Sequence, residues 1–314
     1  MIRMLKNCSM ALLVFFAGIV VMAQQPLHIA DPTLFAFGGK YYLYGTGPAA
    51  DKGFKVYSST DLQQWKDEGF ALTKGEAWGT AGFWAPQVFY YRKRFYMAYT
   101  ANEQLSIAVS DSPLGPFRQS SLRPLSGNGR QIDPYVFFDD DGQAWLYHVR
   151  LQQGNRIFVA KMKPDLSDVD TASAREILHA DLPWENTANA GWPVTEGPTV
   201  IKWKRQYWLW YSANDFRNPD YAVGVAVSKT PFGPFVKKGN GPVISRQVTG
   251  MNGSGHGDLL LIRPGRYKYV FHTHENASAT GSRLGAIIDV RAVRQQFRVD
   301  PYSFRQLQQP ASSF

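Results

Sequence analysis

Short apolar runs separated by turn residues recur along the chain, and the clearest example lies between Gln131 and Tyr147. Asp133-Pro134 opens an apolar run that ends at Phe138, Asp141-Gly142 follows, and a second apolar run ends at Tyr147. An Asp-Gly pair between two β-prone runs indicates a hairpin, because a type I′ turn needs positive φ at both central residues. The segment is therefore predicted to form two antiparallel strands, with an acid at the start of the first.

The same arrangement occurs five times along the chain. The first strands start at positions 31, 85, 133, 196 and 256, and each is followed by a second run rich in aromatic residues. Third β-prone runs follow at 56–58, 107–110, 157–160, 223–228 and 286–288. Two units then lead into fourth strands through near-identical segments, 113–117 and 231–235. Five copies of a four-stranded antiparallel unit predict an all-β fold, a five-bladed β-propeller with four antiparallel strands per blade.

The first residues are typical of a secretory signal peptide. Arg3 and Lys6 precede an apolar stretch at 10–21, and Val21-Met22-Ala23 fits a small-residue cleavage site. The stretch is shorter than the roughly 20 residues that a membrane-spanning helix needs. We therefore expect cleavage near Ala23, a signal peptide over 1–23 and a single propeller domain over 24–314. The mature protein is expected to be secreted or periplasmic, without a membrane span.

Composition adds little to this picture. The single cysteine, Cys8, lies within the expected signal peptide, so the mature chain needs no disulfides and relies on its own core. The formal net charge of +9 falls to +7 without Arg3 and Lys6. A basic balance can favour acidic polymers, but the lysines and arginines are scattered, and we interpret them as solvated surface. We expect a monomer with no nucleic-acid partner.

Carboxylates at the starts of the first strands form the candidate chemical site. Because the first strand of every blade lines the central channel, Asp31, Asp133 and Glu196 are predicted to converge on one mouth of it. A lone Asp before Pro is a common turn residue, but carboxylates focused on one concavity repel one another, as in functional sites. In the fifth blade, His256 is either a structural hydrogen-bonding residue or a ligand of a cation or water below the site.

Taken in order, these motifs resemble those of glycoside hydrolase family 43. The series is Asp31-Pro32, Trp84-Ala85-Pro86, Ile132-Asp133-Pro134, Glu196-Gly197-Pro198 and Gly255-His256-Gly257, together with 58–62 followed by Trp65. The similarity covers essentially the whole chain after the signal peptide. It implies an inverting hydrolase of arabinose- or xylose-containing oligosaccharides and polysaccharides.

The resemblance also implies roles for individual residues. Asp31 matches the general base, Asp133 the carboxylate that orients and tunes the acid, and Glu196 the general acid. Arg283 matches an arginine that contacts the sugar held at the site. The reaction needs no cofactor, and members of the family often hold a structural calcium ion in the channel near the residue matched by His256.

Aromatic residues near the site are candidates for stacking on a pentose ring. The longest insertion, 181–195, precedes the first strand of the fourth blade and is expected to form a pocket wall that carries Trp192. Phe35, Trp84 and Tyr135 lie close to the candidate acids in sequence. For each of the four residues, packing between blades is the alternative interpretation.

The chemistry of the three acids agrees with the resemblance. An inverting glycosidase needs one ionised carboxylate to activate water and one protonated acid for the leaving oxygen, and a third carboxylate helps to keep that acid protonated. Retaining fructosidases also carry three such acids, but the neighbours in Ala30-Asp31-Pro32-Thr33 differ from theirs. A non-catalytic carbohydrate-binding propeller would not need all three acids. We expect an exo-acting α-L-arabinofuranosidase, with β-xylosidase, galactosidase and endo-arabinanase as alternatives.

Overall fold

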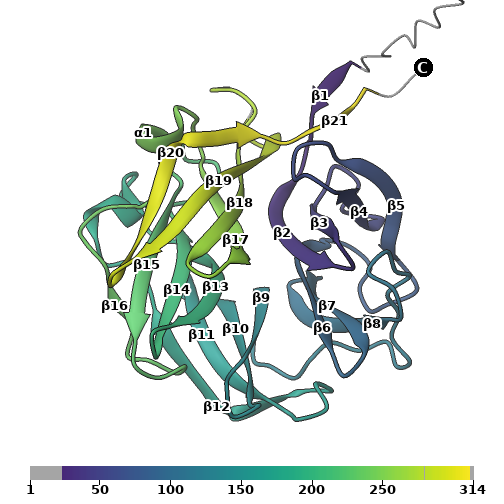
Figure 1. Ribbon diagram of the computed structural model, residues 1–314. Helices are drawn as coiled ribbons and strands as arrows, with labels where there is room; N and C mark the ends of the chain where they lie inside the picture. The colour runs from purple at the N-terminus through teal and green to yellow at the C-terminus, as the bar shows by residue number, and fades with distance from the viewer. Residues whose placement is uncertain (1–22, 279, 312–314) are drawn as a thin grey trace, which may run out of the picture.

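Five antiparallel sheets surround a central channel. The computed structural model describes residues 23–278 and 280–311, and this part of the chain consists almost entirely of β-strands. Within each sheet the strand that comes first in sequence lies next to the channel, and later strands lie further out, as Figure 1 shows. This arrangement confirms the predicted five-bladed propeller. The predicted signal peptide lies outside the described residues, apart from Ala23.

The blades follow one another along the chain. The first contains β2 (Ala30–Phe37), β3 (Lys40–Thr46), β4 (Gly53–Ser59) and β5 (Lys66–Thr73). The second contains β6 (Trp84–Tyr91), β7 (Arg94–Ala101) and β8 (Gln104–Ser110). The third contains β9 (Gln131–Phe138), β10 (Ala144–Leu151), β11 (Asn155–Met162) and β12 (Val169–Leu178). The fourth contains β13 (Thr195–Trp203), β14 (Gln206–Ala213), β15 (Ala222–Ser228) and β16 (Val236–Lys237). The fifth contains β17 (Gly255–Arg263), β18 (Arg266–His274), β19 (Arg283–Val293) and β20 (Gln296–Gln306).

The fourth strand is reduced in the second blade and very short in the fourth. In the second blade, the predicted fourth strand is reduced to a single antiparallel bridge between Val109 and Arg118. In the fourth blade, β16 has only two residues. Both positions are reached through the near-identical segments noted in the sequence, and each segment contains a cis Gly-Pro bond, at Gly115-Pro116 and Gly233-Pro234. Short edge strands of this kind limit unwanted pairing with other chains.

The hairpin between β9 and β10 confirms the predicted strand pairing but not the turn type. Phe138 pairs with Ala144, and Gly142 alone has positive φ in the loop, at 84°. The Gly142 amide donates to the Asp139 carbonyl at 2.9 Å, and the Asp139 amide donates to the Gln143 carbonyl at 3.0 Å. These bonds enclose three residues, so the loop is a turn followed by a left-handed glycine and not a two-residue type I′ turn.

The hydrophobic core lies between blades. Along β7, Phe95, Met97 and Tyr99 pack against the first blade, whereas Tyr96 and Ala98 pack against the third. Successive side chains of a strand point to opposite faces, so a strand that is apolar throughout serves two interfaces. In the described part of the chain, each of the five interfaces between neighbouring blades has its own cluster of buried apolar side chains. This packing fixes the strand starts around the channel.

The two ends of the chain close the ring together. β1 (Gln24–Pro26) pairs antiparallel with β21 (Gln308–Pro310), between the first and fifth blades in Figure 1. The helical elements are short, namely the 3-10 helix η1 (Pro183–Asn186) and α1 (Arg246–Thr249). Within 23–278 and 280–311, no helix has the length and apolar character needed to cross a membrane.

Candidate active site

A β-bulge near the start of every first strand positions the candidate acids. In β2, for example, the pairing register with β3 shifts between Ala30 and Thr33. In each blade the residue inside the bulge has positive φ, between 44° and 59°, and lines the channel. These residues are Asp31, Ala85, Asp133, Gly197 and His256. A bulge redirects a side chain locally, and here it turns five equivalent residues toward the channel axis.

Glu196 lies one residue before the bulge of its strand, which corrects the prediction that the three acids occupy corresponding positions. Because Gly197 occupies the bulge, Glu196 corresponds to Trp84 and Ile132 of the second and third blades. These three residues line one pocket above the channel. Glu196 therefore lines the pocket alone, whereas Asp31 and Asp133 line both the pocket and the channel beneath it.

The bulge amides are bound to the preceding blade. In four of the five blades, the backbone amide of the bulge residue donates to a side chain near the end of the second strand of the preceding blade. The pairs are Ala85 with Thr46, Asp133 with Thr100, His256 with Ser212 and Asp31 with His272, at 2.7–3.1 Å. In the fourth blade the amide of Gly197 donates instead to Oδ2 of Asp133, at 3.1 Å. Neighbouring blades therefore determine where each acid lies.

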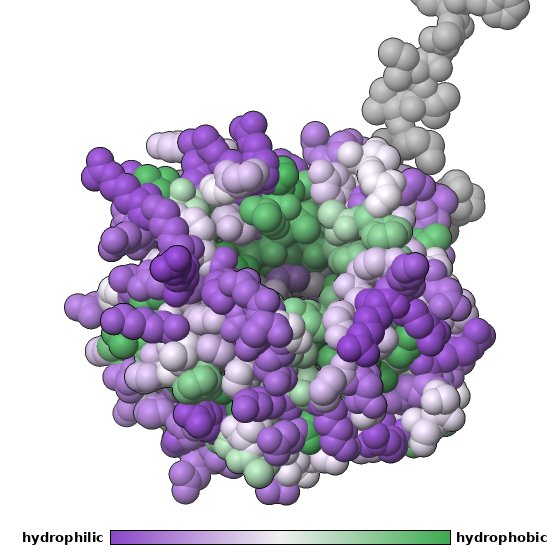
Figure 2. Space-filling model, turned by 60° about the horizontal axis from the view of Figure 1, so that its bottom comes forward, coloured by the Kyte–Doolittle hydropathy of each residue, from purple (hydrophilic) through white to green (hydrophobic). Residues whose placement is uncertain are grey.

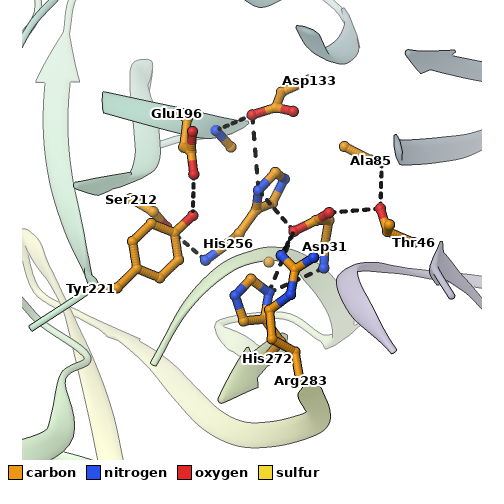
Figure 3. A network of polar contacts seen from close by, with 12 residues as sticks. Asp31, Thr46, Ala85, Asp133, Glu196, Ser212, Tyr221, His256, His272 and Arg283 are labelled. Carbon is orange, nitrogen blue, oxygen red and sulfur yellow. Dashed lines mark hydrogen bonds and ion pairs between the residues drawn. The ribbon is translucent and has the colours of Figure 1, made fainter. Parts of the chain in front are cut away.

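Asp31 is held as an anion. Oδ2 accepts a hydrogen bond from the Thr46 hydroxyl at 2.6 Å, and Nη1 of Arg283 lies 3.3 Å from Oδ1. Burial raises the pKa of Asp31, but the Arg283 charge, the charges of His256 and His272 when these are protonated, and the Thr46 hydrogen bond outweigh it, and the pKa lies below its ordinary value. His256 and His272 also approach Oδ1, yet burial lowers the pKa of both, which leaves them neutral at pH 7. Arg283 is therefore the neighbouring cation, as Figure 3 shows.

Glu196 is buried between two hydrogen-bond donors. The Tyr221 hydroxyl donates to Oε1 at 2.8 Å, and Nδ2 of Asn155 donates to Oε2 at 2.9 Å. Burial raises the pKa of Glu196 to about 7; the charges of Asp31 and Asp215 add to the rise, and the two hydrogen bonds oppose it. A large fraction of Glu196 is thus protonated at neutral pH, as a general acid requires.

Asp133 lies close enough to both other acids to interact with their charges. Its Oδ2 accepts from the Gly197 amide, and Nδ1 of His256 lies 3.9 Å from the same oxygen (Figure 3). Burial, Glu196 and Asp31 raise the pKa of Asp133 well above its ordinary value. Asp133 and Glu196 therefore compete for ionisation, while Asp31 remains charged.

The pocket above the acids has a volume of about 410 Å³ and contains three of the predicted binding residues. Trp84 and Trp192 line it with 37% and 44% of their surfaces exposed, which leaves ring faces open for stacking. Arg283 reaches it beside Asp31, with its guanidinium 4.7 Å from the centre of the Phe216 ring. Figure 2 shows one face of the molecule, with a hollow near its centre and hydrophobic residues along part of the wall.

Comparison with known proteins agrees with this geometry. The family model of the glycosyl hydrolases family 43 matches residues 24–290. The chain belongs to this family. Its members are inverting glycoside hydrolases, so the protein is an enzyme that cleaves glycosidic bonds with inversion.

Solved structures and sequence relatives of this family 43 protein carry several names. A structure named as an endo-1,4-β-xylanase from Bacteroides thetaiotaomicron VPI-5482 is 38% identical, with a TM-score of 0.86 over 92% of this chain and 99% of that chain. A xylosidase/arabinosidase from Bacteroides ovatus is 27% identical over 78% of this chain and 85% of the relative. Extracellular endo-α-(1→5)-L-arabinanase 1 from Bacillus subtilis strain 168 is 25% identical over 78% and 84%.

Two predicted binding residues of this family 43 hydrolase lie outside the upper pocket. Tyr135 lines the narrow channel beneath the acids. Phe35 lies further along β2, where its ring packs against Phe37 and Phe95 between the first two blades. Phe35 and Tyr135 lie four and two residues after the bulge residues of their strands, further along the channel, so sequence proximity did not ensure that either ring would reach the pocket. Blade packing is the role that the structure gives Phe35.

The insertion between β12 and β13 separates its two tryptophans. Trp192 lines the pocket, as predicted, whereas Trp184 in η1 packs against Tyr211. Between them, the fully buried Glu185 accepts from the Tyr211 hydroxyl at 2.6 Å and forms an ion pair with Lys237 at 2.6 Å. The insertion is therefore anchored to the fourth blade, and it is a fixed part of the pocket wall.

Sequence reasoning missed the residues that hold the acids in place. Thr46, Asn155 and Tyr221 contact Asp31 or Glu196, but none lies in the motif series that carries the family resemblance. The threonine at the end of a second strand recurs in Thr100, and this recurrence was the one available signal. Asn155 and Tyr221 reach Glu196 across 41 and 25 residues of sequence, so only the fold brings them together.

The described residues near His256 form no cluster of acidic and histidine side chains for the predicted calcium ion. The described residues contain no group of three or more His, Cys, Asp and Glu side chains that could hold a metal ion. Calcium takes about six to eight oxygen ligands, whereas polar groups below His256 bond to one another. The Thr33 hydroxyl, for example, donates to Asp258 at 2.6 Å.

The channel cation nevertheless stays a prediction with a direct test. If a cation binds near His256, chelator treatment should lower the melting temperature or the activity, and added calcium should restore it. Thermal unfolding and activity of a metal-free preparation, with and without calcium, measure this effect. Identical curves would leave His256 as a hydrogen-bonding residue of the channel.

We predict that Asp133→Asn shifts the basic limb of the rate profile to lower pH. Glu196 must be protonated to act as an acid, so kcat/KM falls as pH rises through its pKa of about 7. Removing the neighbouring carboxylate removes a repulsion that opposes ionisation of Glu196, and the pKa of Glu196 falls. Asparagine tolerates the left-handed backbone at this position, where φ is 57°. A pH series of kcat/KM for both proteins measures the shift, and an unchanged limb would remove Asp133 from this role.

Proposed function

We propose that this protein is an exported, exo-acting α-L-arabinofuranosidase that releases terminal arabinose residues from arabinan-type or arabinoxylan-type glycans. The observation that carries the proposal is the pairing of an ionised Asp31 with a largely protonated Glu196 at one pocket. A pocket of about 410 Å³ lies toward the small end of the range of ligand sites. It suits the end of a saccharide chain. The N-terminal sequence and a relative named as extracellular support export.

In the proposed reaction, two acids act on opposite faces of the sugar. Asp31 takes a proton from a water molecule, and the water oxygen bonds to the anomeric carbon. As that bond forms, the bond to the leaving oxygen breaks, and Glu196 gives its proton to that oxygen. Arg283 keeps Asp31 ionised and reaches the sugar from the same side. The Asp133 carboxylate raises the pKa of Glu196, so that Glu196 carries a proton when the bond to the leaving oxygen breaks.

β-Xylosidase activity is the second candidate. The Bacteroides ovatus relative is named for both activities, and the same pair of acids can act on either pentose. The choice depends on the positions of the sugar hydroxyls in the pocket. The walls formed by Trp84 and Trp192 offer ring faces on which parts of either substrate can stack.

A panel of substrates tests the proposal. Purified protein is incubated with nitrophenyl α-L-arabinofuranoside, nitrophenyl β-D-xyloside, and dye-linked arabinan and xylan, with Asp31→Asn as the inactive control. The proposal expects the highest kcat/KM on the arabinofuranoside and slow release of dye from the polymers. A preference for the xyloside would establish the second candidate. Rapid shortening of a polymer would show endo action and overturn the exo assignment.

A further inference from the structure

Two consecutive hydrogen bonds connect an exposed ring with Glu196. Nε1 of Trp192 donates to Oδ1 of Asn155 at 2.9 Å, and Nδ2 of Asn155 donates to Oε2 of Glu196 at 2.9 Å. Trp192 is 44% exposed, whereas Asn155 and Glu196 are buried at 9% and 8%. All three side chains line the same pocket. A residue that a ligand can touch is therefore connected through a buried amide to the carboxyl group.

The backbone on both sides of this connection is fixed. The backbone N–H of Asn155 donates to the backbone carbonyl of Pro193 at 2.9 Å, and the backbone carbonyl of Asn155 accepts from the Thr195 hydroxyl at 3.1 Å. The start of β11 is thus bound to the end of the insertion that carries Trp192. These backbone bonds hold the Trp192 indole and the side-chain amide of Asn155 close to each other.

We propose that Trp192 and Asn155 are positioning residues that keep the Glu196 proton available to the leaving group, and that Trp192 also forms part of the surface that contacts the leaving group. This inference rests on the proposed role of Glu196 as the general acid. Because Glu196 protonates the leaving oxygen, side chains beside it flank the leaving group and not the sugar that reacts with water. Trp192 then takes part in choosing among leaving groups.

The physical reason lies in the two ends of an asparagine side chain. The amide has an oxygen acceptor at one end and a nitrogen donor at the other, and either end can face Glu196. If the oxygen faced Glu196, the protonated acid would donate its proton to Asn155 and hold it away from the substrate. The indole N–H of Trp192 needs an acceptor and binds that oxygen. It therefore keeps the nitrogen of Asn155 toward Glu196.

Other charged groups also face Glu196, so the effect has to be separated from theirs. The titratable side chains that contact it or line the same pocket are Asp31, Glu103, Asp133, Asp215, Arg217, Tyr221, His256 and Arg283. Neither Trp192 nor Asn155 carries a charge, and their removal leaves all eight in place. A change in the pH profile of variants at these two positions therefore reports the hydrogen bonds themselves.

The insertion offers a matched control for the indole N–H. Trp184 lies in the same insertion, and its Nε1 is buried with no hydrogen-bond partner among the described residues. Trp192→Phe and Trp184→Phe each remove an indole N–H and keep an aromatic ring. Only the first substitution breaks a bond that leads to Glu196. Asn155→Leu removes the middle of the connection and keeps similar volume.

The test measures kcat and KM for these variants on a series of aryl pentosides whose phenols differ in acidity, and repeats kcat/KM across pH. General acid catalysis supplies roughly 10²- to 10⁴-fold, and we expect Trp192→Phe to lose about tenfold on the poorest leaving groups. The loss should be smaller on activated ones. The basic limb should move to higher pH in Trp192→Phe and Asn155→Leu, because the ionised form of Glu196 loses a donor. Trp184→Phe should match the wild type throughout.

Two outcomes would overturn the inference. One is a Trp192→Phe variant with the leaving-group dependence and pH profile of Trp184→Phe. The other is a loss in Trp192→Phe that is the same for all leaving groups and appears only in KM, which would leave Trp192 as a stacking surface alone. Melting temperatures show whether Asn155→Leu is folded, and Trp192→Phe decides the matter if it is not. Failure of the proposed function would appear separately, as an unchanged basic limb in Glu196→Gln.

Discussion

Asp31→Asn is expected to lower kcat/KM by roughly 10²- to 10⁴-fold on every substrate, because the variant lacks the base that takes the proton from water. Leaving-group acidity should not alter the loss, since the base acts on the water and not on the leaving oxygen. In the wild type, the low pKa of Asp31 keeps the base ionised down to acidic pH. The acid limb of the profile should therefore lie well below neutrality.

The choice of asparagine for this variant follows from the backbone. Asp31 has a φ of 48°, which Asn tolerates and most other residues adopt at a cost of about 1–2 kcal/mol. Asp31→Ala would combine loss of the base with that strain. Steady-state kinetics and a melting curve on Asp31→Asn separate chemistry from folding. Retention of most activity in a folded variant would exclude Asp31 as the base.

Glu196→Ala is expected to produce a loss that depends on the leaving group. Substrates with a poor leaving group need its proton, and their kcat/KM should fall by roughly 10²- to 10⁴-fold. Dinitrophenyl glycosides release a stable phenolate and should lose much less. The variant should also lose the basic limb that the wild type shows near the Glu196 pKa of about 7. Kinetics on a graded series of aryl pentosides measure both effects.

Glu196→Gln is the matched control for this experiment. It keeps the side-chain volume and the contact with Tyr221 but has no acidic proton to give. We expect the same dependence on the leaving group as in Glu196→Ala. An equal loss on activated and poor leaving groups in both variants would show that Glu196 acts in binding or structure. The acid would then have to be sought elsewhere in the pocket.

Much of the fold could be predicted because each blade repeats a local pattern. A turn residue, an apolar run and a second turn recur at every first strand. These features are local in the sequence, so they can be recognised without knowing the fold. Turn types and edge strands were less certain. The Asp141-Gly142 loop gains a third residue, and the second blade has only a bridge at its fourth position. Both depend on contacts outside the segment.

The three acids of the site were predicted from the sequence, but the strand position of Glu196 and the residues that hold the acids were not. Aligning the repeats on their acids placed Glu196 level with Asp31, whereas aligning them on the following proline would have placed Gly197 there. The proline marks the bulge, because every bulge residue except His256 precedes one. The partners of Glu196 come from other strands and loops. No pattern along the sequence brings Asn155 or Tyr221 to this carboxyl group.

Proton NMR of the first-formed sugar gives the most direct test of the assignment of Asp31 as a base and Glu196 as an acid. If Asp31 activates water on the face opposite to the leaving group, hydrolysis of an α-L-arabinofuranoside yields β-L-arabinose first, and the α anomer appears only as the product equilibrates. Spectra recorded within the first minutes, at an enzyme concentration that outpaces mutarotation, resolve the two. Initial release of the α anomer would contradict the account, because retention requires a carboxylate that attacks the sugar itself.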